Sequence, residues 1–147
     1  MSEWKHEEFT VTDERSRLDL AVIHSFLLRS YWAPDVPLEI VRRSIENSLC
    51  FGAFAGERQI GFARVITDRA TFAYLADVFV LEDWRRRGVS KFLVRCIREH
   101  PELQNLRRWM LATADAHGLY RQFGFHELRE PQRLMEIVDR DVYQRMR

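Results

Sequence analysis

The 147-residue sequence contains few of the residues that usually mark a secreted, metal-binding or membrane protein. Its two cysteines, Cys50 and Cys96, both fall in apolar patterns, which favours two buried small side chains over a disulfide. The five histidines lack metal-ligand spacing and there is no Cys-x-x-Cys, so no metal site is expected. There is no run of about 18 apolar residues and no signal-like start. We therefore expect a cytoplasmic protein without a membrane partner.

An excess of charge of one sign is also lacking. Lys and Arg number 23 and Asp and Glu number 22, which argues against a general nucleic-acid or membrane-surface binder. Six glycines and four prolines form no linker, and there is no internal repeat. Hydrophobic residues make up 46% of the chain, which is enough for a core. Residues 1–147 are therefore expected to form a single domain in which any basic function is local.

Helical spacing of apolar residues occurs twice in the first third of the chain. It begins at Leu18, where Asp13 or Ser16 is the expected N-cap, and again at Leu38, just after Pro37. The face that the first helix is expected to bury holds Leu18, Ala21, Val22 and Phe26.

Extended patterns follow, separated by two further helical segments, Val89–Ile97 and Ala114–Gln122, the first of which ends before Pro101. The sequence thus predicts an α/β fold with a mixed, mostly antiparallel sheet of six to seven strands and about four flanking helices. The expected strands are Phe9–Val11, Leu49–Phe54, Gln59–Ile66, Thr71–Val80, Trp109–Ala112, Phe125–Leu128 and Leu134–Val138.

The turn after the long strand carries concentrated positive charge. Arg85, Arg86 and Arg87 precede Gly88, and Lys91 follows in the helix. The unpaired N–H groups at a helix start form an anion site, and glycine allows a phosphate to approach closely. A solvated basic turn is the alternative, but the position between a buried strand and an amphipathic helix favours a diphosphate. There is no Gly-Lys-Ser/Thr, which excludes a Walker A loop. The second and third glycines of the Rossmann dinucleotide-binding fingerprint are also missing, which excludes that motif.

A second motif lies near the C-terminus. Tyr120 shares the apolar face of a short predicted helix that ends in Phe123-Gly124-Phe125. A tyrosine in such a position is most often a core residue. It can also serve as a proton donor, because a phenol retains its proton at neutral pH.

Together these motifs resemble the two signatures of the GNAT superfamily of N-acetyltransferases. The turn Arg85–Ser90 is similar to Gln/Arg-x-x-Gly-x-Gly/Ala, with Ser90 in the last position, and Tyr120 before Gly-Phe resembles the second signature. The resemblance covers most of the chain from Leu18 onward. It implies a GNAT-like fold and acetyl-CoA as co-substrate, with the backbone amides of the turn Arg85–Ser90, including those of Gly88 and Val89, holding the pyrophosphate.

The resemblance also implies roles for individual residues. Val78, Phe79 and Val80 lie beside the thioester in this comparison, where a backbone N–H polarises its carbonyl. Tyr120 takes the position next to the coenzyme sulfur, where its phenol protonates the departing thiolate. Thr113 stands where many relatives have Asn, and its hydroxyl either binds the pantetheine arm or caps the helix.

The acceptor side of the site is less defined. Asp77 is the nearest carboxylate and is expected to be either a general base or a structural aspartate. Tyr31 and Trp32 are expected either to stack on the acceptor or to pack on the core. His117 is more typical of a surface residue than of a proton relay. Cys96, on the core face of its helix, is badly placed as a nucleophile.

The sequence therefore predicts an N-acetyltransferase in which a primary amine attacks acetyl-CoA directly in a ternary complex. The acceptor is expected to be a small-molecule or peptide amine of unidentified type. A homodimer is compatible with the resemblance, since homodimers are common in that family. The alternatives are a non-catalytic acyl-CoA-sensing module and an unrelated nucleotide-phosphate binder.

Overall fold

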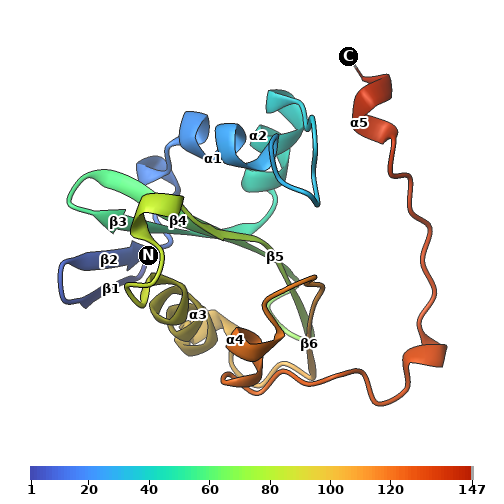
Figure 1. Cartoon of the computed structure of the whole chain (residues 1–147). Coiled ribbons are helices and arrows are strands. Elements are labelled where there is room, and N and C mark those ends of the chain that lie inside the picture. The colour runs from blue at the N-terminus through green and yellow to red at the C-terminus, as the bar shows by residue number, and fades with distance from the viewer. Residues whose placement is uncertain (147) are drawn as a thin grey trace.

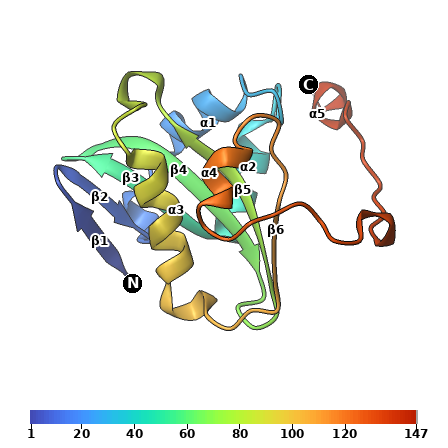
Figure 2. The same ribbon diagram turned by 60° about the horizontal axis from the view of Figure 1, so that its bottom comes forward.

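The computed structural model describes residues 1–146 and places helices on both faces of one sheet (Figures 1 and 2). The longest of the described helices has 11 residues, and crossing a bilayer takes about 20. The strands are β1 Glu3–His6, β2 Phe9–Thr12, β3 Leu49–Ala55, β4 Arg58–Thr67, β5 Phe72–Val80 and β6 Arg108–Leu111. The α-helices are α1 Leu20–Leu27, α2 Leu38–Glu46, α3 Val89–Glu99, α4 His117–Arg121 and α5 Val142–Arg145.

The six strands lie side by side in the order in which they occur in the chain. Neighbours from β1 to β5 are antiparallel, and β6 runs parallel to β5. A parallel pair needs a crossover connection, which α3 supplies. The predicted mixed, mostly antiparallel α/β fold is confirmed.

The two faces of the sheet carry separate apolar cores. Helices α1 and α2 cover one core, whereas α3 covers the other, with α4 beside it (Figure 2). Strand β3 is buried on both faces from Leu49 to Phe54, as its unbroken apolar sequence indicates. The predicted apolar face of α3 is confirmed, since all five of its members are buried: Val89, Phe92, Leu93, Cys96 and Ile97.

Helix α1 begins later than the sequence analysis placed it. Its N-cap is Asp19, whose Oδ1 accepts a hydrogen bond of 3.2 Å from the backbone N–H of Val22. The later start changes which residues face the core, so that Ile23 and Leu27 are buried. The predicted caps Asp13 and Ser16 were therefore wrong, and of the predicted face Leu18 and Phe26 pack on the core while Ala21 is exposed.

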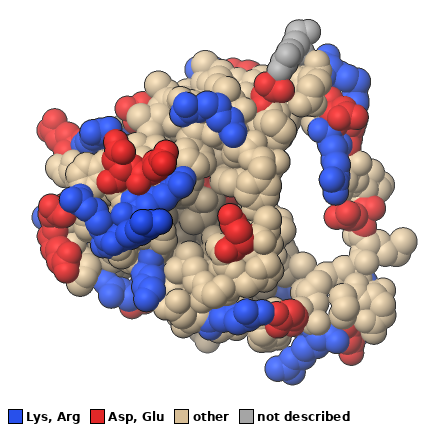
Figure 3. All heavy atoms as spheres, in the orientation of Figure 1, with Lys and Arg blue, Asp and Glu red and all other residues tan. Residues whose placement is uncertain are grey.

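The two closing strands, predicted at Phe125–Leu128 and Leu134–Val138, do not form. After α4 the chain leaves the body as a C-terminal arm, residues 126–146, which ends at α5 (Figure 1). The space-filling view shows an opening between this arm and the body (Figure 3). A strand needs a hydrogen-bonded neighbour, and within residues 1–146 the arm has none. The sheet has six strands nevertheless, because the sequence analysis missed β1, a short polar strand.

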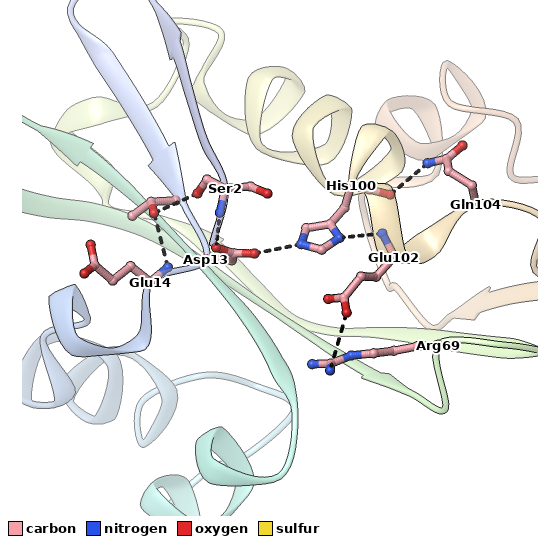
Figure 4. A network of polar contacts seen from close by, with 8 residues as sticks. Ser2, Asp13, Glu14, Arg69, His100, Glu102 and Gln104 are labelled. Atoms are coloured by element: carbon pink, nitrogen blue, oxygen red, sulfur yellow. Dashed lines mark hydrogen bonds and ion pairs between the residues drawn. The ribbon is translucent and has the colours of Figure 1, made fainter.

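A buried hydrogen bond between side chains fixes the end of α3 against the sheet. His100 Nε2 lies 2.7 Å from Oδ2 of Asp13, and the backbone N–H of Ser2 donates to Oδ1 of the same carboxylate at 2.7 Å (Figure 4). Burial raises the pKa of Asp13, but the hydrogen bonds from Ser2 and His100 outweigh it and hold that pKa below its usual value. Asp13 therefore joins β2 to α3 and does not cap α1.

Candidate functional site

A cleft opens where β5 and β6 separate. Their parallel pairing runs from Phe72 and Arg108 to Leu75 and Leu111. Beyond these pairs β5 continues to Val80, while the chain after β6 turns toward α4. The cleft between the two walls has a volume of about 910 Å³, which suits a cofactor-sized ligand.

A β-bulge shapes the β5 wall of this cleft. The register between β4 and β5 shifts so that Asp77 and Val78 together oppose Ala63. Asp77 has a φ of 56°, which is uncommon for a residue other than glycine. A bulge leaves the extra residue outside the ladder, so its backbone groups are available to a ligand. The structure thus brings Val78, Phe79 and Val80 to the cleft, as expected from the sequence.

Asp77 is held by two donors on the same wall. Trp32 Nε1 donates to its Oδ1 at 2.9 Å, and Arg64 Nε donates to its Oδ2 at 2.8 Å. The side chains of Arg64 and Asp77 are only 17% and 12% exposed, so this ion pair is largely shielded from water. Arg64 also donates to Ser48 Oγ at 3.2 Å. Both oxygens of the candidate base therefore accept hydrogen bonds within the protein, one from the indole of Trp32 and the other from Arg64.

Tyr31 links the two walls of the cleft. Its ring meets Trp32 edge-on, with 5.0 Å between centroids, and its hydroxyl accepts a hydrogen bond of 3.1 Å from the backbone N–H of Ala114. The expected acceptor residues Tyr31 and Trp32 thus both line the cleft, and Tyr31 is 61% exposed. An acceptor that enters here meets two aromatic surfaces.

Tyr120 lies on the α4 wall. The residue is only 8% exposed, and burial raises its pKa to about 12, with smaller contributions from Tyr31 and Asp115. Its ring packs against Phe125 in a T-shaped contact with 5.9 Å between centroids. Among residues 1–146 the Tyr120 hydroxyl makes no hydrogen bond, although the residue lines the cleft. It is therefore a protonated phenol whose hydrogen is available to a ligand.

Thr113 and His117 occupy the loop and the first turn beside Tyr120. The Thr113 hydroxyl accepts hydrogen bonds from the backbone N–H groups of Asp115 at 3.4 Å and Ala116 at 3.1 Å. Thr113 lines the cleft, and its hydroxyl orders the loop just before α4, whose N-cap is Ala116 without a side-chain hydrogen bond. His117 is exposed and does not line the cleft.

The start of α3 lies at one end of the cleft. Gly88 is its N-cap with a φ of 81°, and a Cβ at this position would meet nothing within 4 Å. The helix begins next to Ser90, which lines the cleft, and the N–H groups of a first helical turn have no acceptor within their own helix. Arg85 also lines the cleft, and its Nε donates to the carbonyl oxygen of Val80 at 3.0 Å.

Not every residue of the basic turn reaches the cleft. The Arg87 guanidinium lies over the Trp84 ring at 4.8 Å from the centroid and 4.0 Å from Glu8. The side chain of Val89 is buried in the core, so only its backbone can face a ligand. Arg86 and Lys91 are exposed and outside the lining of the cleft. The structure thus brings Arg85 and Ser90 to the site and leaves these four side chains outside it.

Sequence reasoning missed several side chains of the site, among them Arg64 and Tyr143. Arg64, on β4, orients Asp77 across the sheet, and Tyr143, on α5, lines the cleft from the far end of the chain. Neither has a local sequence signal, because both contacts depend on tertiary structure. The two cysteines are buried, free thiols, and burial raises each pKa to about 12, so neither is a thiolate nucleophile. Among residues 1–146 no three His, Cys, Asp or Glu side chains gather as metal ligands.

Three comparisons identify the family. Residues 46–127 match the model of the acetyltransferase (GNAT) domain. A Gibberella zeae protein provisionally named an acetyltransferase is 26% identical, over 86% of this chain and 84% of its own length.

Solved structures agree with the family model. A Xanthomonas campestris protein, provisionally described as a GNAT-family acetyltransferase, is 50% identical with a TM-score of 0.91 over 95% of this chain and 99% of its own. A GNAT-family acetyltransferase from Elizabethkingia anophelis, solved with acetyl-CoA bound, is 13% identical with a TM-score of 0.64 over 82% of this chain and 78% of its own. The chain belongs to the GNAT family of acetyltransferases.

Proposed function

We propose that this protein transfers the acetyl group of acetyl-CoA to the primary amine of a small molecule or peptide, by direct attack in a ternary complex. The observation that carries the proposal is the Tyr120 phenol. It is protonated, has no hydrogen-bond partner among the described residues, and lies across the cleft from the bulged strand β5. A proton donor in this position suits a reaction that releases a thiolate.

The cleft has the features that a coenzyme A thioester needs. The diphosphate would bind to the N–H groups at the start of α3, with Gly88 allowing close approach and Arg85 and Ser90 adding charge and a hydroxyl. The pantetheine arm would lie between the separated strands. The acetyl-CoA in the Elizabethkingia anophelis structure supports this choice of co-substrate.

The chemistry follows from these placements. A neutral amine attacks the thioester carbonyl, the C–N bond forms and the C–S bond breaks. Backbone groups at the bulge beside Val78 would polarise the carbonyl. Tyr120 gives its proton to the departing thiolate, and the phenolate then regains one from the ammonium that the attack creates. The products are an amide and a free thiol, so the protons balance.

Asp77 fits a positioning role better than the role of general base. Both of its oxygens accept hydrogen bonds, from Trp32 and Arg64, and a base must accept the proton of the substrate instead. Held in this way, Trp32 and its neighbour Tyr31 form an aromatic wall for the acceptor. We therefore place the acceptor amine between this wall and Tyr120.

An amine panel tests the proposal. Purified protein is incubated with acetyl-CoA and small amines, amino acids and peptides, and the release of free thiol is measured. We expect turnover with at least one acceptor class. Double-reciprocal plots from two-substrate kinetics should intersect, as a ternary complex requires, and should not be parallel. Saturable acetyl-CoA binding without turnover across the panel would indicate the acyl-CoA-sensing module. Tighter binding of ATP or NAD than of acetyl-CoA in thermal-shift measurements would indicate the nucleotide binder.

A further inference from the structure

The acceptor end of the cleft is lined by aromatic rings. Phe26 and Tyr31 both neighbour Trp32, with 6.1 Å between the ring centroids of Phe26 and Trp32 and 5.0 Å between those of Tyr31 and Trp32. Tyr31 is 61% exposed, so part of its ring is free to meet a ligand. The face of an aromatic ring carries partial negative charge and attracts a cation. The aromatic wall formed by Tyr31 and Trp32 therefore favours a ligand with a positive charge.

The charged side chains that line the cleft do not balance along its length. Arg64 and Asp77 form the shielded ion pair and cancel each other. Arg85 lies at the end next to α3, where the diphosphate is proposed to bind. The remaining charged residue of the lining is Asp115, on the loop between β6 and α4. Among residues 1–146, the lining away from α3 thus has one carboxylate that no basic side chain neutralises.

Asp115 lies close to both the aromatic wall and Tyr120. It is exposed, and its carboxylate makes no hydrogen bond or ion pair with the described residues. Its loop is tied to the aromatic wall, because the backbone N–H of Ala114 donates to the hydroxyl of Tyr31 at 3.1 Å. Burial is the main cause of the raised pKa of Tyr120, and the nearby Tyr31 and the negative charge of Asp115 raise it further. The carboxylate therefore acts electrostatically at the place where the acceptor reacts.

A carboxylate in this position suits a charge that the acceptor keeps during the reaction. A primary amine is protonated near neutral pH and must lose a proton before it attacks the thioester. If Asp115 paired with the reacting amine, it would stabilise the ammonium form and oppose that loss. If it paired with a second ammonium group, the attraction would persist from binding to product release. The free carboxylate thus favours an acceptor with two cationic groups.

We propose that the acceptor is a small diamine, whose second ammonium group lies between Asp115 and the aromatic wall while its first amine reacts beside Tyr120. This inference rests on the acetyl transfer proposed above and names its acceptor. The second ammonium keeps its protons throughout, so the products are the mono-acetylated diamine and a free thiol. An acidic group in the same position would be repelled by Asp115, and Arg64 is already paired with Asp77.

Three amines of similar length test the charge preference. Diaminobutane, butylamine and aminobutyrate carry a positive, a neutral and a negative group at the end away from the reacting amine. Calorimetry on protein saturated with CoA, which has no acetyl group to transfer, measures their Kd values. We expect diaminobutane to bind about fivefold more tightly than butylamine, aminobutyrate to bind most weakly, and the differences to shrink at high salt.

Thiol release from acetyl-CoA is measured in parallel with the same amines, and it separates this inference from the acetyl transfer. Thiol release with equal Kd values for the three amines would overturn the diamine and leave the acetyl transfer intact. Binding in the expected order without thiol release would contradict the acetyl transfer and support the diamine site. Failure of all three amines to bind would overturn the diamine site.

Asp115→Asn tests the residue itself. The variant removes the charge and keeps the shape of an exposed side chain without internal bonds, so folding should be unaffected. We expect the Kd for diaminobutane to rise about fivefold, to the value for butylamine, and the Kd for butylamine to stay unchanged. Glu57→Gln is the matched control, since it removes an exposed carboxylate in the turn between β3 and β4, outside the cleft, and should preserve the preference.

Two results with these variants would overturn the role of Asp115. One is a preference for diaminobutane that survives in Asp115→Asn. The other is an equal loss of kcat/KM for all three amines in Asp115→Asn, because a group that acts on the reacting amine would affect every acceptor alike.

Discussion

Asp77 and Tyr120 face the same cleft from opposite walls, and their environments differ. Both oxygens of Asp77 accept hydrogen bonds, from Arg64 and Trp32, within a largely shielded ion pair. The Tyr120 hydroxyl has no such partner in the part of the chain that the structure describes, and burial raises its pKa to about 12. A group whose hydrogen bonds are all made inside the protein positions its neighbours, whereas a group left unpaired in a cleft is available to a ligand.

The difference assigns the two walls different tasks. In the proposed mechanism the β5 wall would bind and orient the ligands, through the bulge at Asp77, the Trp32 indole and the start of α3 at Gly88. The α4 wall would supply the proton. This division of tasks predicts different outcomes for variants of the two walls.

Tyr120→Phe should have the largest effect, because it removes only the transferable proton. We expect kcat to fall about 100-fold, with little change in the KM for acetyl-CoA. Initial rates of thiol release measure both constants. Tyr74→Phe is the matched control, since Tyr74 also lines the cleft but lies on β5, and its loss of a hydroxyl should change kcat little. Equal effects of the two variants would remove the distinction between the walls.

Gly88→Ala tests the phosphate end of the β5 wall. The φ of 81° disfavours any L side chain, so the start of α3 should shift. We expect the Kd for acetyl-CoA to rise about tenfold, which corresponds to about 1.4 kcal/mol, while Tyr120 chemistry persists at saturation. Gly56→Ala, at a φ of 60° in the turn between β3 and β4, has the same backbone cost away from the cleft. Calorimetry should show an unchanged Kd for acetyl-CoA in Gly56→Ala. A rise in Kd equal to that of Gly88→Ala would contradict the placement of the diphosphate at the start of α3.

Asp77→Asn separates positioning from base catalysis. Removing the charge opposite Arg64 should lower the free energy of unfolding by about 2 kcal/mol and raise the acceptor KM several-fold. Arg64→Gln should produce the same pair of changes, since it breaks the same contact from the other side. Chemical denaturation and steady-state kinetics measure them. If Asp77→Asn alone abolished turnover and left the free energy of unfolding unchanged, Asp77 would be the general base. The β5 wall would then take part in proton transfer.

The stability of the protein at alkaline pH tests the burial of Tyr120 in the absence of any substrate. Burial raises the folded-state pKa of Tyr120 from its usual value of about 10 to about 12. This contribution to stability is complete below about pH 10 and is lost as the pH rises toward 12. The free energy of unfolding should therefore fall more steeply over this interval in the wild type than in Tyr120→Phe. Cys50 and Cys96 titrate in both proteins and cancel in the comparison, so parallel curves would show that Tyr120 is not buried.

Local patterns predicted those parts of the molecule that depend on neighbouring residues. The amphipathic face of α3 and the glycine before it were identifiable because helical spacing and capping act within a few residues. The contact of Arg64 on β4 with Asp77 on β5 was not identifiable, and neither was the place of Tyr143 in the cleft. Contacts between distant segments leave no local signal. The strand predicted at Leu134–Val138 has the right composition, but a strand also needs a partner, and this segment pairs with no strand of the described chain.

The central claim is that the start of α3 and the separated strands β5 and β6 together hold acetyl-CoA. Isothermal titration calorimetry of the full chain with acetyl-CoA tests it most directly. The comparison ligand is S-acetylpantetheine, a thioester that lacks the diphosphate. The account predicts one saturable site per chain for acetyl-CoA and much weaker binding of the truncated thioester. Equal affinity for both, or no heat from folded protein at millimolar acetyl-CoA, would contradict it.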